Sequence, residues 1–389
     1  MSKIPVAIDL FSGCGGISTG LLDAGVRVVA GFDSESRAIE AYNYNHNYRG
    51  ARGFIADLET LSGKQLLAMA NVPSIDLLAG GPPCQAFSIV GHRKGLTDHR
   101  GTLVFNFIHL VEELSPSVFM MENVPNLLSV NDGAVFAQFR RSFEDLGYKV
   151  SWAIVAAANY GVPQMRKRLI VAGTKGKVAI TLPPPPTHIP NERTSLLQND
   201  LPSHVTCREA IGDLPDVESR KADMVPNHEP TQHGPSMLKA LAQLIPGKRD
   251  KKSFHDRLHP DRLSYTLRAG NGNFSPLRPI HYKYHRVISV RESARLQGFS
   301  DNFLWPDSIP RLQQYRQVGN SVPPPLASAI ARQCAKAMGW SLAPDKFKGN
   351  PLSRPQAFTL SRAQRDRARI SRIRGASLGA AIGSLHNPR

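Results

Sequence analysis

The sequence predicts an α/β protein with a doubly wound, mostly parallel sheet and a smaller irregular domain. Residues 1–175 alternate strand-like and helix-like segments, which is typical of a sheet covered by helices on both faces. The proline run Pro183–Pro186 ends this alternation, and residues 187–285 are enriched in Pro, His, Lys and Arg. We therefore expect a large domain over residues 1–182, a second domain over 183–285, a segment 286–345 that returns to the first domain, and a basic, disordered tail over 346–389.

The predicted strands are short apolar runs, and the predicted helices carry apolar residues at helical spacing. The strands cover Val6–Phe11, Val26–Phe32, Ile75–Ala79, Val118–Met121, Ser151–Ala156 and Leu169–Ala172. The helices cover Ile17–Ala24, Ser36–Asn45, Leu103–Leu114 and Val135–Leu146, with further helical patterning at Ser293–Leu296 and Pro325–Met338. Ligands of such sheets bind at the carboxyl ends of the strands, so the loops there are the candidate site.

Charge points to a polyanionic partner. The 389 residues carry a formal net charge of +17. Such an excess of positive charge attracts polyanions, and nucleic acid is the first candidate. The four cysteines lie far apart, which argues against zinc ribbons and disulfide frameworks, and we expect no metal site. Asp9 interrupts the first apolar run, and no apolar stretch of about 18 residues occurs, so we expect neither a signal peptide nor a membrane span. A cytoplasmic protein is predicted, associated with the nucleoid if bacterial.

The loop after the first strand predicts a nucleotide pocket. Asp9–Gly16 is rich in glycine and opens a helix, but its spacing matches neither the dinucleotide-binding pattern nor a P-loop. Asp33 ends the second strand, where it could bind both hydroxyls of a ribose. Asp57 lies near the expected position of an adenine amino group, and Phe11 could stack on that adenine. An adenosine without phosphates fits this set better than NAD or ATP does, and S-adenosylmethionine is such a ligand.

A thiol follows the third predicted strand. Cys84 lies in Gly80–Ser88, where Pro82 and Pro83 fix two backbone angles and stiffen the loop. This arrangement favours a nucleophile held at the edge of the sheet. A free thiol has a pKa of about 8.5, so a nearby cation or helix N-terminus would be needed to raise its thiolate fraction.

An acid and two cations are predicted at the same edge. Glu122 ends the next strand, and a carboxyl group in a partly dry pocket can donate a proton or a hydrogen bond to a ring nitrogen. Arg166 and Arg168 enter a later strand two residues apart and therefore share one face. Their guanidinium groups could orient Glu122 and hold a phosphate or a carbonyl oxygen.

Thiol, acid and sulfonium methyl group together define a reaction. The C5 atom of cytosine is too weak a nucleophile to take a methyl group directly. Addition of a thiolate at C6 creates an enamine whose C5 atom is nucleophilic, and hydrogen bonding or protonation at N3 favours that addition. Methyl transfer, loss of the C5 proton and release of the thiol follow, so covalent catalysis divides one difficult step into easier ones.

At this point the chain resembles the DNA (cytosine-5)-methyltransferase family, over about residues 4–340. The matching motifs are Asp9–Gly16, Gly81–Gln85, Glu122–Val124, Gln164–Arg168, Arg291–Phe299 and Gln317–Pro323. They occur in the family's usual order, and the six motifs together are far more specific than any one of them alone. The resemblance implies a S-adenosylmethionine-dependent methyltransferase fold, with the target-recognition region between the arginine motif and Arg291.

The resemblance also implies the role of each site residue. Cys84 is the nucleophile, Glu122 the partner of N3, and Arg166 and Arg168 the supporting cations. The pocket for S-adenosyl-L-methionine is expected to consist of Phe11, Gly13, Gly15, Asp33, Asp57, Pro83 and Asn320. Gly91–Thr102 resembles the loop that closes over DNA.

Double-stranded DNA is the expected partner, bound by a monomer, with a cognate restriction endonuclease acting on the same site. A stacked cytosine cannot reach Cys84, so the target base must be flipped out of the duplex. Basic residues suited to phosphate contacts are Lys248, Arg249, Lys251, Lys252, Arg257, Arg262 and Arg268, and the glycine-rich loop Arg268–Phe274 is suited to base edges. The basic tail is expected to add non-specific DNA affinity. An RNA cytosine-5 methyltransferase and a catalytically silent DNA-binding protein of the same fold remain the alternatives.

Overall fold

The computed structural model describes residues 3–83, 103–176, 178–190, 200–250, 254–270 and 279–343. Contacts within the chain group Met1–Asn350 into one compact unit, to which every element below belongs. The other unit, Pro351–Arg389, lies outside the described residues, and so does the predicted basic tail. Among the helices that the structure describes, none is both long and apolar enough to cross a membrane.

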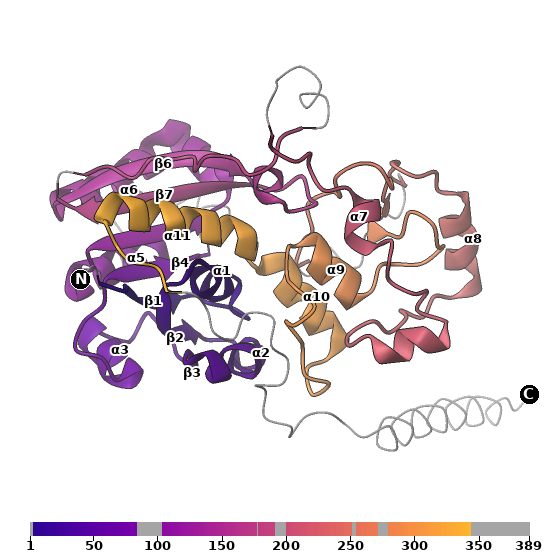
Figure 1. Cartoon of the computed structure of the whole chain (residues 1–389), viewed down its shortest axis with the longest axis horizontal. Helices are drawn as coiled ribbons and strands as arrows, with labels where there is room; N and C mark the ends of the chain where they lie inside the picture. The colour runs from indigo at the N-terminus through magenta and orange to yellow at the C-terminus, as the bar shows by residue number, and fades with distance from the viewer. Residues whose placement is uncertain are drawn as a thin grey trace, which may run out of the picture. The chain divides into compact units, whose positions relative to one another are not determined.

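A seven-stranded sheet forms the centre of this unit (Figure 1). Its strands lie in the order β3-β2-β1-β4-β5-β7-β6. The first five pair in parallel, whereas β7 runs antiparallel to both β5 and β6. The bounds are β1 (Val6–Leu10), β2 (Arg27–Asp33), β3 (Arg52–Ile55), β4 (Leu77–Gly80), β5 (Val118–Asn123), β6 (Tyr148–Ala156) and β7 (Lys167–Lys175). The predicted doubly wound, mostly parallel sheet is confirmed.

Alternate residues of the central strands pack against helices on opposite faces. On β5, Met120 belongs to the cluster of buried side chains that includes α1 (Gly16–Ala24) and α11 (Pro324–Met338). Its neighbours Phe119 and Met121 belong to the cluster that includes α5 (Leu103–Leu114) and α6 (Ala134–Asp145). Every residue of β5 is buried, as expected for a strand covered on both faces.

Further helices, turns and two short strands complete the compact unit. They are α2 (Ser36–His46), α3 (Gly63–Ala70), α7 (Cys207–Ile211), α8 (Pro235–Gln243), α9 (Val290–Leu296) and α10 (Arg311–Asn320), the two-residue strands β8 (Asp256–Arg257) and β9 (Pro279–Ile280), and the 3-10 turns η1 (Asn47–Arg49), η2 (Pro125–Gly133), η3 (Ala157–Tyr160) and η5 (Arg220–Met224). A third apolar cluster joins α7 to α9 and α10. The irregular region after the proline run therefore packs on the helices that follow it.

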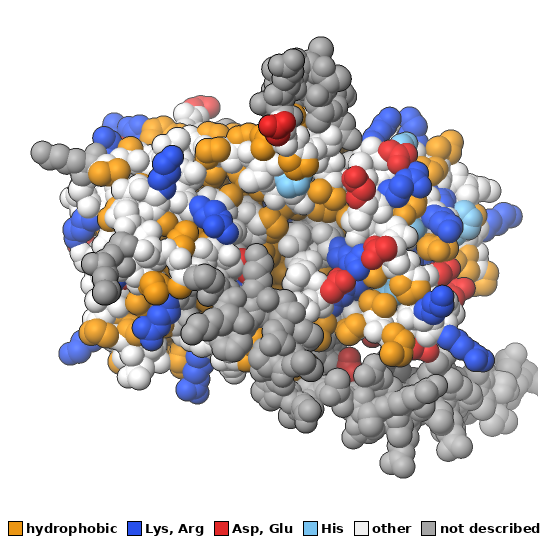
Figure 2. Space-filling model, in the orientation of Figure 1, with side chains coloured by type: hydrophobic (Ala, Val, Ile, Leu, Met, Phe, Trp, Pro, Cys, Tyr) orange, Lys and Arg blue, Asp and Glu red, His pale blue; other side chains and the backbone are white. Residues whose placement is uncertain are grey.

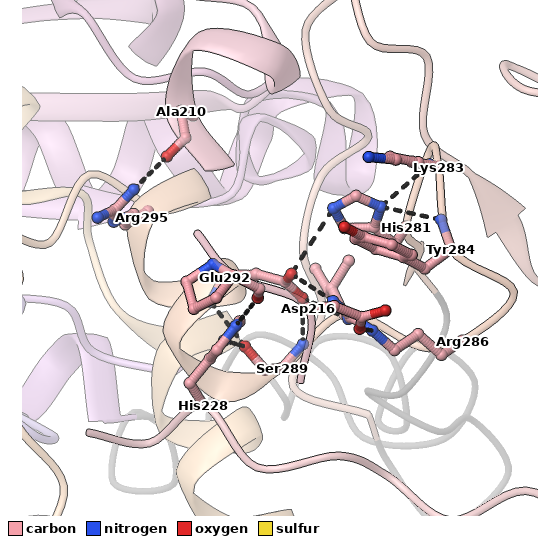
Figure 3. A network of polar contacts seen from close by, with 12 residues as sticks. Ala210, Asp216, His228, His281, Lys283, Tyr284, Arg286, Ser289, Glu292 and Arg295 are labelled. Atoms are coloured by element: carbon pink, nitrogen blue, oxygen red, sulfur yellow. Dashed lines mark hydrogen bonds and ion pairs between the residues drawn. The ribbon is translucent and has the colours of Figure 1, made fainter. Parts of the chain in front are cut away.

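A buried polar network holds this irregular region on α9 (Figure 3). Glu292 accepts hydrogen bonds from both terminal nitrogens of Arg286, each at 2.8 Å. The Nδ1 atom of His281 accepts the backbone N–H groups of Lys283 at 3.0 Å and Tyr284 at 3.2 Å, while its Nε2 atom lies 3.7 Å from Glu292. Burial lowers the pKa of His281 to about 4, which keeps the ring neutral and the turn fixed.

One predicted phosphate contact needs revision. Arg257 is 5% exposed and donates hydrogen bonds to the carbonyl oxygens of Leu241 and Leu244, so it supports the fold from within. Lys248, Arg249, Arg262 and Arg268 are exposed, and Arg249 also pairs with Asp256 at 2.6 Å. Lys251, Lys252 and residues 271–278 lie outside the described residues.

Candidate active site

The loop between β1 and α1 turns sharply. Its backbone φ is 53° at Phe11, 54° at Gly13 and 97° at Gly15, in the left-handed region that glycine adopts easily. A Cβ atom on Gly15 would overlap the imidazole of His46, whereas one on Gly13 would meet no atom within 4 Å. Gly15 is therefore needed for packing, and Gly13 leaves its backbone open to a ligand. Phe11 holds the same conformation without being glycine, a strain typical of ligand sites.

Asp33 is tied to this loop at the carboxyl end of β2. Its Oδ2 atom accepts the Gly13 N–H at 2.9 Å, and its Oδ1 atom accepts the Glu35 N–H at 2.9 Å. Burial raises the pKa of this carboxyl group. Asp57 is exposed two residues beyond the end of β3 and accepts the Glu59 N–H at 3.0 Å. The two predicted acids thus lie at the carboxyl ends of neighbouring strands.

The end of α10, which lies about 300 residues later in the sequence, contacts the loop between β1 and α1. The Sγ atom of Cys14 lies 3.1 Å from the Oγ atom of Ser321, and a Cβ atom on Gly16 would overlap the carbonyl oxygen of Val322. Asn320, the last residue of α10, precedes Ser321 and is exposed. The structure therefore places Asn320 beside the glycine loop.

Glu122 and Arg168 form an ion pair at the carboxyl end of β5. Arg168 Nε lies 2.8 Å from Glu122 Oε1, and the two side chains are only 15% and 12% exposed. A Cβ atom built on Gly81 would lie 3.4 Å from Glu122 Oε2. One carboxylate oxygen thus binds the arginine, and the other faces the backbone that leads to Cys84.

Arg166 has other partners. Its guanidinium donates to the carbonyl oxygens of Leu267 at 3.3 Å, Gly319 at 3.2 Å and Ser321 at 3.1 Å. Burial, followed by the charge of Arg168, lowers the pKa of Arg166 to about 9, while Glu122 opposes this shift. Arg166 is therefore a buried structural residue that joins two backbone segments, one at Leu267 and one at Gly319–Ser321, and it lies close enough to Arg168 and Glu122 to feel their charges.

The loop that carries the thiol is anchored where it leaves the sheet. Asn123 Nδ2 donates to the carbonyl oxygen of Pro82 at 3.0 Å. Pro82 is buried and Pro83 is exposed. Cys84 itself and the predicted closing loop Gly91–Thr102 lie outside the described residues.

Comparison with known proteins settles the family. The family model for C-5 cytosine-specific DNA methylases matches residues 6–336. The chain belongs to this family. The methyltransferase is 34% identical over 344 residues to Type II methyltransferase M1.HphI of Haemophilus parahaemolyticus, a match that covers 85% of this chain and 86% of the relative. Type II methyltransferase M.XorII of Xanthomonas oryzae pv. oryzae is 32% identical, with 86% and 85% covered.

Solved structures agree with this assignment. A prophage-encoded protein from E. coli, described as a DNA modification methyltransferase, matches with a TM-score of 0.69 and 27% identity over 86% of this chain and 99% of that chain. The S. pombe Dnmt2 methyltransferase matches with a TM-score of 0.60 at 18% identity, which shows the shared fold. The protein is a DNA (cytosine-5)-methyltransferase, and its family uses S-adenosylmethionine as methyl donor.

The sequence analysis assigned no role to Asp9, which lies beside the methyltransferase site. Asp9 is completely buried behind the glycine loop, where its Oδ2 atom accepts the Ser18 N–H at 3.0 Å and the Ser18 hydroxyl at 2.7 Å. The Ser18 hydroxyl lies 2.9 Å from the Tyr42 hydroxyl. Burial raises the pKa of Asp9 to about 7. Asp9 therefore fixes the first turn of α1, and a lone carboxylate within an apolar strand was the signal for it.

Proposed function

We propose that this methyltransferase modifies C5 of a cytosine flipped out of duplex DNA, through a covalent bond between Cys84 and C6. The observation that carries the proposal is the buried Glu122–Arg168 pair at 2.8 Å, beside the backbone of Gly81. In a sheet of this topology, that position lies at the strand ends where ligands bind. The loop bearing Cys84 starts there, so thiol and acid can reach one base together.

Cys84, Glu122 and Arg168 have distinct roles in the proposed reaction. The Cys84 thiolate adds to C6, and the π electrons shift from the C5–C6 bond through C4 toward N3, where the Glu122 carboxyl group, in its protonated form, donates a hydrogen bond or a proton. The C5 atom becomes nucleophilic and takes the methyl group. Transfer of the C5 proton to solvent restores the C5–C6 double bond as the C6–S bond breaks, and Cys84 leaves as a thiolate. Arg168 orients the Glu122 carboxyl group throughout, because its Nε atom binds one of the two oxygens.

The glycine loop fits S-adenosylmethionine, which supplies the methyl group when bound. Open space beside Gly13 allows close approach of the ligand, and Asp33 is fixed beside it by the Gly13 N–H. Asp33 would bind the ribose, Asp57 the adenine amino group, and Phe11 the adenine face. Gly15, Pro83 and Asn320 would complete the pocket.

The proposed substrate and partners are tested with labelled S-adenosylmethionine. We expect label to enter duplex DNA and to be absent from RNA treated in parallel. Label in RNA alone would support the RNA methyltransferase alternative, and no label in either would support the silent DNA-binding protein. We also propose that the enzyme acts as a monomer, beside a restriction endonuclease of the same specificity; the type II names of the relatives M1.HphI and M.XorII favour the endonuclease partner.

We propose that residues 183–285 determine which DNA sequence is methylated. Residues 1–182 and 286–345 form the catalytic domain in this proposal, and residues 346–389 add non-specific DNA affinity. The irregular region is built from short elements and carries exposed cations, and Figure 2 shows Lys and Arg side chains over its visible face. Such cations suit phosphate contacts, which position a protein on DNA.

A chimera tests this assignment. Residues 183–285 are replaced by the corresponding segment of a relative, except for Ser264–Leu267, because Ser264 pairs with Pro163 and Met165 through their backbones. We expect the methylated sequence to change and the chemistry to persist, as read by bisulfite sequencing of a random duplex pool. An active chimera that still modifies the original sequence would refute the assignment.

A further inference from the structure

Tyr42 fills a slot behind the glycine loop that three glycines leave open. It lies on α2, which packs against β2 and β3 (Figure 1), and it is completely buried. A Cβ atom would lie 2.9 Å from the Tyr42 ring at Gly15 and 2.8 Å at Gly53, and closer still at Gly31. A side chain at any of these glycines would therefore displace the ring. The glycine loop, β2 and β3 are shaped around this one tyrosine.

The Tyr42 hydroxyl ends a chain of hydrogen bonds that reaches the first turn of α1. It lies 2.9 Å from the Ser18 hydroxyl, which donates to Asp9 Oδ2 at 2.7 Å. Because the ionised Asp9 carboxylate only accepts, the Ser18 oxygen is left to accept the Tyr42 proton. Asp9 Oδ2 also accepts the Ser18 N–H at 3.0 Å. The N-cap residue of α1, Gly15, provides no side-chain cap, so Asp9 caps this helix in its place.

One turn further along α2, His46 supports the same loop. Its Nε2 atom lies 2.9 Å from the Thr19 hydroxyl, which donates to the Gly15 carbonyl oxygen at 2.8 Å. Its ring packs on that of Tyr42, with 4.3 Å between the centroids. The imidazole also occupies the space that a side chain on Gly15 would need. Two buried rings of α2 therefore hold Gly15 from behind.

The other end of α2 reaches the acid proposed to bind the ribose. Glu35, the N-cap residue of α2, donates its N–H to Asp33 Oδ1 at 2.9 Å. The second oxygen of Asp33 accepts the Gly13 N–H, also at 2.9 Å. One helix thus contacts the proposed cofactor pocket twice, through Glu35 at its start and through Tyr42 and His46 at its end. Sequence analysis assigned none of these three residues a role.

We propose that Tyr42 is a positioning residue for the cofactor, which holds the glycine loop and the first turn of α1 in the shape that binds S-adenosylmethionine. The inference rests on the proposed function of the glycine loop. Phe11 holds a left-handed backbone conformation in that loop, and such a conformation persists only where its surroundings enforce it. When the support weakens, fewer molecules hold the competent shape, and the apparent affinity falls by the same fraction.

Tyr42→Phe keeps the ring in its slot and removes the hydroxyl. We expect the dissociation constant for S-adenosylhomocysteine, an unreactive product, to rise about 3- to 10-fold, the effect of losing one buried hydrogen bond. The KM for S-adenosylmethionine should rise in parallel. The kcat at saturating cofactor and the KM for DNA should stay near those of the wild type, because the thiol, the acid and the recognition region are unchanged. A general loss of stability would not produce this split.

Tyr148→Phe is the matched control. Tyr148 is 3% exposed on β6, and its hydroxyl donates to the Pro116 carbonyl oxygen at 2.7 Å, away from the glycine loop. This variant loses a buried tyrosine hydroxyl of the same kind, and it should bind S-adenosylhomocysteine as the wild type does.

A second variant tests the route through Ser18. Ser18→Ala should also weaken binding of S-adenosylhomocysteine, and adding Tyr42→Phe to it should change little, because the tyrosine hydroxyl has already lost its partner. Additive effects of the two substitutions would contradict the inference. A folded Tyr42→Phe enzyme with wild-type affinity, or one that loses kcat alone, overturns it as well. Failure of the wild-type protein to bind S-adenosylhomocysteine overturns the proposed function with it.

Discussion

Cys84→Ser should abolish methyl transfer while leaving S-adenosylmethionine binding intact. A serine hydroxyl stays protonated at neutral pH and is a far weaker nucleophile than a thiolate, so addition at C6 should fail. The pocket proposed for the cofactor is centred on the glycine loop, and Cys84 belongs to the loop after β4. Turnover is measured by transfer of labelled methyl groups to duplex DNA, and binding by titration with S-adenosylmethionine in the absence of DNA.

Cys334→Ser is the matched control, because it replaces a thiol by a hydroxyl at a residue outside the proposed site. Cys334 is fully buried on α11, in the apolar cluster that packs on the sheet. Its replacement should lower stability and preserve the rate of the folded enzyme. Methylation by Cys84→Ser at a rate near that of wild type would exclude the covalent mechanism.

The sequence predicted the sheet and the acids at its edge because both follow from local patterns. Buried apolar runs mark β1, β2, β4 and β5, and parallel strands bring their carboxyl ends to one edge. Asp33 and Glu122 could therefore be placed by counting to the end of a strand. The strand β3 escaped prediction because Arg52–Ile55 is short and half exposed, and α10 escaped because its residues are mostly polar.

Long-range polar contacts could not be predicted in this way. Nothing near Arg166 in the sequence indicates that its guanidinium binds Leu267, Gly319 and Ser321, since hydrogen bonds to carbonyl oxygens leave no periodic pattern. The burial of Arg257 could not be predicted either. A basic residue in a basic region suggests a phosphate contact, and only the fold shows that this side chain is buried and binds backbone carbonyl oxygens.

Glu122→Gln should reduce turnover by roughly 100-fold or more, the usual scale for loss of a general acid. The amide can still accept a hydrogen bond from Arg168 Nε, as Glu122 Oε1 does at 2.8 Å, so the local geometry should survive. It can also still donate a hydrogen bond to N3 but cannot deliver a proton. DNA and cofactor affinities should therefore change little, and the loss should appear in the rate of methyl transfer.

Glu144→Gln supplies the matched control for this variant. Glu144 lies on α6, where its Oε1 atom is 3.4 Å from Arg140 Nε and its side chain is 44% exposed, and surface ion pairs of this kind contribute little. The control should retain full activity, which separates loss of an ion pair from loss of the proton donor. Single-turnover rates at saturating DNA and S-adenosylmethionine give the comparison. If Glu122→Gln keeps the wild-type rate and loses affinity for DNA, then Glu122 is a contact residue, and the acid must be sought elsewhere along the carboxyl edge of the sheet.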